Sequence, residues 1–273
     1  MLRLSGLTQA AALLLLLALP ARAADIAFDR PLLQGGIAVG TAPQGAKVVF
    51  AGQVLRLSPQ REFVIGFGRD ETAAELTLVW PGGRTETRNL RIGARKFDIQ
   101  RIDGLPTKMV SPDPKDLERI KEEGRRAATV RTANTPELWW KAPFVWPVKG
   151  RISGVYGSQR ILNGEPRSPH WGVDVAAPTG TPVVAPAAGI VRLSDDFYLT
   201  GLTVIIDHGY GVYSSLVHLS EMTVKDGQQV QQGETIGRVG MTGRATGPHL
   251  HWGMNLFNIR IDPELVVGPM PQG

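Results

Sequence analysis

Between residues 26 and 92 the chain consists of short runs rich in strand-forming residues, separated by Gly, Pro and Asp. The runs are GGIAVG, AKVVFAGQVLRLS, EFVIGF, ELTLVW and TETRNLRI. They recur about every ten residues, a spacing typical of short antiparallel strands joined by tight turns. The pattern predicts a small antiparallel β-sandwich, Ig-like, over residues 24–97. We interpret it as a structural or spacing domain, because its sequence contains no histidine and no recognisable catalytic motif.

A helical pattern follows at residues 113–130, inside a linker that we assign to residues 98–142. Asp113 is a suitable N-cap and Pro114 suits the first helical position. An apolar stripe at helical spacing is formed by Leu117, Ile120, Ala127 and Ala128. The charged opposite face predicts contact with solvent. Four aromatic residues come next, and we interpret them as a docking core at the entrance of the next domain: Trp139, Trp140, Phe144 and Trp146.

Strand patterns return in residues 143–273. The runs include TPVVAP, GIVRLS, LTVIIDH, VYSSLVHLS, ETIGRVG and PHLHWGMNLF. Glycine-containing turns such as DHGYG separate them, and no amphipathic helix is needed. The second domain is therefore predicted to be an all-β barrel or sandwich, and the whole chain mostly β.

The first residues of the chain predict that the protein is exported. Residues 1–23 have the three parts of a secretory signal peptide: Arg3, an apolar run from Ala10 to Leu19, and small residues at Ala21 and Ala23. That run is too short for a membrane span, so the protein is predicted to be exported and not membrane-spanning. Removing Arg3 and Arg22 lowers the formal net charge from +5 to +3. This mild bias, without a basic stripe, argues against nucleic acid as a partner.

The chain contains no cysteine, so disulfides and cysteine nucleophiles are excluded. Motifs of other chemistries are also missing from the sequence: HExxH, G-x-S-x-G, a phosphate loop and a dinucleotide fingerprint. No pair of carboxylates stands out as that of a glycosidase.

All five histidines fall in the second half of the chain: His170, His208, His218, His249 and His251. His170 precedes Asp174 by four residues, a spacing that lets both side chains converge in an extended segment or a helix. His249 and His251 flank Leu250, so on a strand both imidazoles share one face while Leu250 points the other way.

Imidazole and carboxylate suit zinc, and a catalytic zinc takes three protein ligands and keeps one open position. His170, Asp174 and either His249 or His251 would complete such a set. The remaining histidine, and His218 on a neighbouring strand, would be available as proton carriers. His208 lies in a Gly-rich turn beside Asp207, and we interpret it as a surface or turn-stabilising residue.

Together these residues resemble the lysostaphin-type (LytM-like) zinc endopeptidases that cut peptidoglycan peptides. The resemblance covers about Trp146 to Val267 and rests on WPVKGRISGVYG, HWGVD, PTGTPVVAPAAGIV, DHGYG, HLS and TGRATGPHLHWGM. It implies a duplicated hybrid motif fold and one Zn²⁺ per chain bound by His170, Asp174 and His251. It also implies that His218 and His249 are the unligated catalytic histidines, that peptidoglycan peptide stems are the substrate, and that the periplasm is the location.

Three positions depart from the family pattern. Leu216 replaces a Tyr common in relatives, Ala245 replaces a Ser, and Arg160 lies one position later than in the usual G-x-R pattern. None removes a predicted ligand.

Alternative functions remain open from the sequence. A non-catalytic relative would bind the wall and activate amidases, and a zinc protease of the same construction would act on proteins. Retention of all five mapped residues favours the enzyme. The first domain would then serve as a spacer, a wall-binding module or a cover of the active site, and any regulatory protein partner is unknown.

Overall fold

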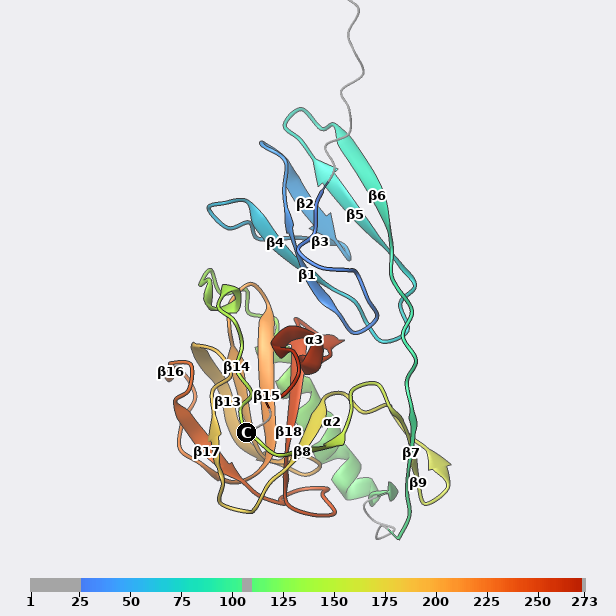
Figure 1. Ribbon diagram of the computed structural model, residues 1–273, viewed down its shortest axis with the longest axis vertical. Helices are drawn as coiled ribbons and strands as arrows, with labels where there is room; N and C mark the ends of the chain where they lie inside the picture. The colour runs from blue at the N-terminus through green and yellow to red at the C-terminus, as the bar shows by residue number, and fades with distance from the viewer. Residues whose placement is uncertain (1–25, 105–109, 272–273) are drawn as a thin grey trace, which may run out of the picture.

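The computed structural model describes residues 26–104 and 110–271. The predicted signal peptide at residues 1–23 lies outside the described residues. Figure 1 shows an elongated molecule with two lobes: the strands β1 to β6 form the upper lobe, and the later strands form the lower lobe with α2 and α3. No helix in the described ranges has the length and apolar character needed to cross a membrane.

The first lobe is built from two antiparallel sheets. One pairs β1 (Ile37–Thr41) with β4 (Glu62–Gly66). The other has the order β3-β2-β5-β6, from β2 (Lys47–Phe50), β3 (Gln53–Val54), β5 (Ala73–Val79) and β6 (Thr85–Arg91). Alternate residues of these strands are buried in a common core that includes Val48, Phe63, Ile65 and Leu76. The strands of this lobe correspond to the strand-forming runs that recur about every ten residues in the sequence.

The second lobe is dominated by one large antiparallel sheet with the order β16-β13-β14-β15-β18-β11-β8. Its strands are β8 (Arg151–Gly154), β11 (Val173–Ala176), β13 (Gly189–Phe197), β14 (Gly201–Asp207), β15 (Val212–Met222), β16 (Gln229–Val230) and β18 (His249–Leu256). Three further strands join it at the side, namely β12 (Pro182–Val184), β17 (Thr235–Val239) and β19 (Ile259–Ile261).

This sheet is open, with β16 and β8 at its two edges. The prediction of a mostly β chain is confirmed, and of the barrel or sandwich expected for the second domain the open sheet agrees with a sandwich and not with a closed barrel. One face of the sheet packs into the main core, where Val175, Leu216, Leu250 and Trp252 are almost fully buried. The side chains that alternate with these core residues lie on the opposite face, where the functional site is built.

A fourth sheet, with three strands, was not predicted. β7 (Ile99–Ile102) pairs in parallel with β9 (Gln159–Leu162), and β9 pairs with β10 (Glu165–Pro166). In Figure 1, β7 continues the long descent from the first lobe and runs beside β9. The start of the segment that the sequence assigns to a linker is therefore a strand of the second lobe.

α2 (Pro114–Val130) begins after Asp113 with Pro114 in its first turn, although the Asp113 side chain makes no capping hydrogen bond. Its apolar stripe differs from the expected one, since Leu117 is 40% exposed. Ala127 and Val130 instead pack against a small cluster formed by Leu193, Phe197, Ile205 and Tyr213. α2 therefore covers the sheet face opposite the main core.

Two short helices complete the fold. The 3₁₀ helix η1 (Trp139–Lys141) lies among the aromatic residues, of which Trp140, Phe144 and Trp146 are buried in the main core. Trp146 packs edge-on against Trp252, with ring centroids 5.6 Å apart. α3 (Pro263–Val267) was not predicted; its N-cap Asp262 accepts a hydrogen bond from the backbone N–H of Glu264 at 3.0 Å. Val64 of β4 belongs to the same main core, so the two lobes share apolar contacts.

Candidate metal centre

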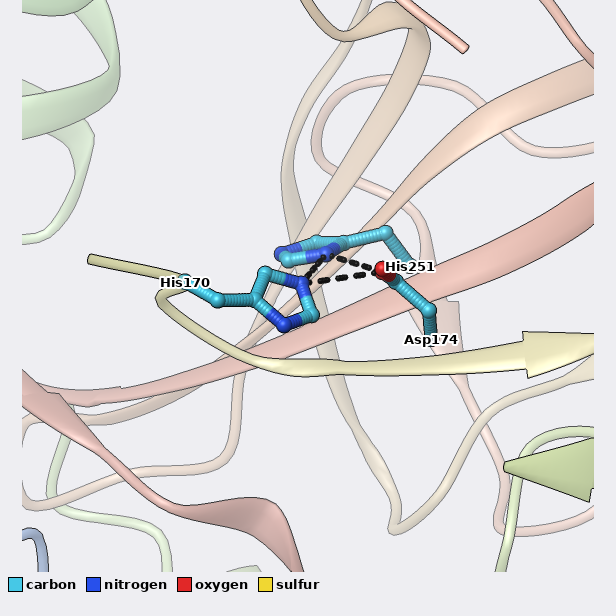
Figure 2. A group of neighbouring side chains, drawn as sticks. All are labelled: His170, Asp174 and His251. Atoms are coloured by element: carbon cyan, nitrogen blue, oxygen red, sulfur yellow. Dashed lines mark hydrogen bonds and ion pairs between the residues drawn. The ribbon is translucent and has the colours of Figure 1, made fainter. Parts of the chain in front are cut away.

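Two strands and the turn before one of them bring His170, Asp174 and His251 together. β11 pairs with β18 so that Asp174 lies directly opposite His251. His170 precedes β11 and folds back toward both, as Figure 2 shows. Oδ1 of Asp174 lies 2.7 Å from Nδ1 of His251 and 3.0 Å from Nε2 of His170, and these two nitrogens are 2.8 Å apart. Three candidate ligand atoms therefore converge on one point.

The hydrogen bond at the other ring nitrogen of His170 favours a cation at this point. Nδ1–H of His170 donates to the carbonyl oxygen of Val155 at 3.0 Å. In the neutral ring this leaves Nε2 with a lone pair that faces the Asp174 carboxylate. Two acceptors at that distance repel each other unless a proton or a metal ion lies between them. The fixed ring and the His/Asp/His donor set fit a zinc ion, whose ligating histidines are usually held in this way.

Burial and neighbouring charges shift the pKa values of Asp174 and His251. Burial alone would raise the pKa of the Asp174 carboxyl, but hydrogen bonds and charge from His170 and His251 outweigh it and hold this pKa well below its usual range. Burial lowers the pKa of His251 to about 4, against the effect of Asp174. At neutral pH the cluster therefore offers a carboxylate and an unprotonated His251, which is the form that binds metal.

His218 and His249 lie beside this cluster with their rings turned toward each other. Their ring centroids are 4.8 Å apart, and Nε2 of His249 is 3.8 Å from Oδ1 of Asp174. Nδ1–H of His218 donates to the carbonyl of Thr242, and Nδ1–H of His249 donates to that of Gly247, each at 2.8 Å. In their neutral forms both rings therefore carry the lone pair on Nε2.

His218 has two unusual properties for a strand residue. Its φ of 62° lies in the left-handed region, which is strained for a residue with a side chain. Burial, together with the charges of His251 and His249, lowers its pKa to about 3. The ring is therefore held neutral at physiological pH, as a proton acceptor must be.

A cleft of about 290 Å³ opens beside Asp174, His218 and His249. Its walls carry the cationic side chains of Arg160 and Arg244, and Gln100 of β7 also lines it. The linker segment thus contributes a wall of the cleft through β7.

Arg160 and two glycines are site residues that the sequence did not identify. Nη2 of Arg160 lies 3.2 Å from Oδ2 of Asp174, while its Nε–H donates to Oε1 of Gln100 at 3.3 Å. A Cβ on Gly154 would contact the Asp174 carboxylate, and one on Gly172 would lie 2.7 Å from Nε2 of His251. The signal available in the sequence was the pair of motifs GRISG and HWGVD, but only the strand register shows that their glycines face the cluster.

His208 lies apart from the cluster, and its predicted surface position is wrong. The side chain is fully buried. Nδ1–H donates to the carbonyl of Ala188 at 2.8 Å, and Nε2 accepts from the hydroxyl of Ser214 at 2.9 Å. The ring stacks edge-on against Phe144, so it ties the DHGYG turn to the main core.

This burial predicts a pH-dependent stability. Burial lowers the pKa of His208 from 6.5 to about 4, against the opposing hydrogen bond to Ala188 and the charge of Asp207. Between these values the unfolded chain binds a proton that the folded chain does not, so the free energy of unfolding falls as the pH falls. We expect the wild type to lose about 3 kcal/mol more between pH 7 and pH 4 than His208→Gln, whose amide preserves both hydrogen bonds. Urea unfolding of both proteins at several pH values measures this, and equal losses would contradict it.

These features place the chain among the metallopeptidases: an open antiparallel sheet carries a His/Asp/His cluster beside two further histidines. Within that class the chain belongs to peptidase family M23, whose family model matches residues 168–263. The resemblance to lysostaphin-type enzymes is thereby confirmed. A crystal structure of a protein from Pseudomonas aeruginosa assigned to peptidase M23 is 31% identical, with a TM-score of 0.67 over 89% of this chain and 97% of that one.

Two curated relatives are similar to part of the chain. Peptidoglycan DD-endopeptidase ShyA of Vibrio cholerae is 42% identical over 105 residues, which are 38% of this chain and 24% of that protein. The DD-carboxypeptidase/endopeptidase Mpg of Neisseria meningitidis is 42% identical over 103 residues, again 38% of this chain and 24% of that protein. The chain thus spans about a quarter of the length of these curated relatives.

Proposed function

We propose that this protein is an exported zinc metalloendopeptidase that hydrolyses DD-type peptide cross-links of peptidoglycan, in the periplasm. His170, Asp174 and His251 are its zinc ligands, and His218 and His249 are its catalytic residues. The observation that carries the proposal is the convergence of three ligand atoms within 2.7–3.0 Å of one another, beside two further imidazoles. The names of the relatives ShyA and Mpg support peptidoglycan as the substrate.

When bound, zinc supplies a Lewis acid for the scissile carbonyl and lowers the pKa of water toward 7. Positioning of the ligands and proton transfer are the roles of residues of the chain. Arg160 holds Oδ2 of Asp174 and so fixes the direction of Oδ1. The backbone carbonyls of Thr242 and Gly247 hold the rings of His218 and His249 with Nε2 unprotonated. One Nε2 takes the proton of the attacking water, and the imidazolium then stabilises the developing oxyanion or protonates the leaving amine.

The competing function, a non-catalytic wall-binding protein that activates amidases, needs neither the ligands nor the two proton carriers. A binder gains nothing from a buried His218 held in a strained backbone conformation. The structure of the site therefore favours the enzyme.

Removal of the metal is the direct test. We expect the full chain to release soluble fragments from isolated sacculi, to lose this activity after treatment with a chelator, and to regain it with added zinc. Mass analysis of the fragments identifies the bond that is cut. A zinc-loaded, folded protein that leaves sacculi intact would support the non-catalytic function instead, and cleavage of the bond between sugar and peptide would point to an amidase.

A further inference from the structure

A second cavity lies beneath α2, on the same sheet face as the metal-ligand cluster. Its volume is about 270 Å³, far more than the roughly 15 Å³ that a single water needs. The sheet side of the cavity is lined by Thr203, Ser215 and His251, and α2 provides Ile120 and Ala127 on the other side. Figure 1 shows α2 behind the sheet at this place. The cavity therefore adjoins His251 but is separate from the cleft that holds His218 and His249.

Arg131 and Arg260 line this cavity, and neither has an anionic partner in the part of the chain that the structure describes. Arg131 follows the last turn of α2 and is only 6% exposed. Its Nη2–H donates to Oγ of Ser215 at 3.1 Å, whereas its Nε has no hydrogen-bond partner in the part of the chain that the structure describes. Among residues 26–104 and 110–271, neither Arg131 nor Arg260 forms an ion pair. Buried charges are normally paired, so this arrangement is costly for the protein alone.

Two more observations mark this region as one that favours an anion. Burial, together with the charge of Arg260, lowers the pKa of Arg131 to about 9, so the guanidinium stays charged at neutral pH. Asn255 lies opposite Arg260 in the pairing of β18 with β19. It is 1% exposed, and neither polar atom of its side chain has a partner among the described residues.

The carboxylate of Glu123, which also lines the cavity, does not neutralise these arginines. Its Oε1 accepts from Nε–H of Arg119 at 2.6 Å, and its Oε2 accepts from the backbone N–H of Tyr198 at 2.8 Å. Glu123 is thus engaged by other donors, and its carboxylate is already paired with Arg119.

We propose that the cavity beneath α2 is a subsite for a carboxylate of the substrate, bound by Arg131 and Arg260. The planar guanidinium of an arginine matches a carboxylate with two parallel hydrogen bonds. The walls formed by Ile120, Phe197 and Val217 suit a small apolar residue that carries this carboxylate. Because the cavity adjoins His251, the free carboxylate belongs to a peptide that is cut close to its carboxyl end. This inference rests on the proposed function, since it names a feature of the same substrate.

A pair of substrates tests the subsite. The peptide cut in sacculi is synthesised twice, with a free carboxylate and with a carboxamide at the end that enters the cavity. For the zinc-loaded full chain we expect kcat/KM to be about 10- to 100-fold higher for the acid, mainly through KM. Arg131→Gln and Arg260→Gln should each reduce this preference to near one. The matched control Arg125→Gln changes an exposed arginine of the same helix and should keep the preference.

A binding measurement separates this proposal from the proposed function. Acetyl-D-alanine and its amide are titrated into the full chain by NMR, and inorganic phosphate is titrated as a competitor. Charge-dependent binding of the acid that is lost in Arg131→Gln, without hydrolysis of any peptide, would keep the subsite and overturn the enzyme. Equal cleavage of acid and amide by the wild type would keep the enzyme and overturn the subsite. Binding of phosphate with no preference for acid over amide would leave only a general anion site and also overturn it.

Discussion

Replacing His251 with alanine is expected to abolish both zinc binding and hydrolysis. In the proposed site His251 supplies one of three ligand atoms, and the variant would leave His170 and Asp174 of that set to hold the ion. Even the loss of a residue that supports a ligand typically costs 10- to 100-fold in metal affinity, and the loss of the ligand itself costs more. We expect bound zinc to fall from about one per chain to less than about 0.1 after dialysis, and the release of fragments from sacculi to fall to background.

Elemental analysis of the dialysed proteins measures this outcome, with His208→Gln as the control. His208 is also a buried histidine, but it lies outside the ligand cluster. The control should retain its zinc and its activity. If His251→Ala kept one zinc per chain under the same dialysis, the ligand set proposed here would be wrong.

The fold of this chain follows from local patterns to a large extent. Strand runs between glycine and proline turns predict the mostly β architecture, and the alternation in PHLHW predicts that Leu250 is buried while its neighbours face a site. Leu250 is indeed fully buried in the main core. What the pattern leaves open is the pairing of strands, and pairing decides whether a sheet closes into a barrel. This is why an open sheet and a barrel were equally compatible with the sequence.

The histidines of the candidate site could be predicted from the sequence because histidine is a rare residue in this chain. Histidines are few, and all five fall in one lobe. In the sequence Arg160 is visible only as a departure from a family pattern, because its position depends on the parallel pairing of β7 with β9, which joins segments about sixty residues apart. The buried position of His208 depends in the same way on Ala188 and Ser214, which its turn alone does not reveal.

The burial of a charged residue on α2 is a further feature that the sequence does not predict. The charged face expected to contact solvent is exposed at Lys115, Glu118, Lys121, Glu122 and Arg125. Glu123, which does not belong to that face, is the most buried residue of the helix. The carboxylate is buried because Tyr198, in the turn after β13, supplies a backbone donor for it. Arg119, four residues earlier on the same helix, supplies the other donor. The contact with Tyr198, like the burial of Arg131 beside Ser215, depends on a distant segment and cannot be predicted from the local sequence.

Replacing His249 with alanine is expected to leave zinc in place and to remove most of the turnover. Nδ1–H of His249 is held by the carbonyl of Gly247, so Nε2 is the atom that can accept a proton and, once protonated, donate a hydrogen bond to the oxyanion. A single such donor is typically worth 100- to 1000-fold in kcat. We expect a loss of this size with bound zinc unchanged at about one per chain. His218→Ala should behave similarly, because its Nδ1–H is held by Thr242.

The double variant distinguishes a shared role from two separate ones. If His218 and His249 serve the same proton transfer, His218→Ala combined with His249→Ala should cost about as much as either change alone. If one accepts the proton while the other stabilises the oxyanion independently, the two losses should multiply. Steady-state kinetics on the synthetic peptide, with elemental analysis of each variant, measures both. Full turnover in zinc-loaded His249→Ala would contradict its proposed role, even if His251 proved to be a ligand, because the proposal assigns Nε2 of His249 to proton transfer and Nδ1 of His251 to the metal.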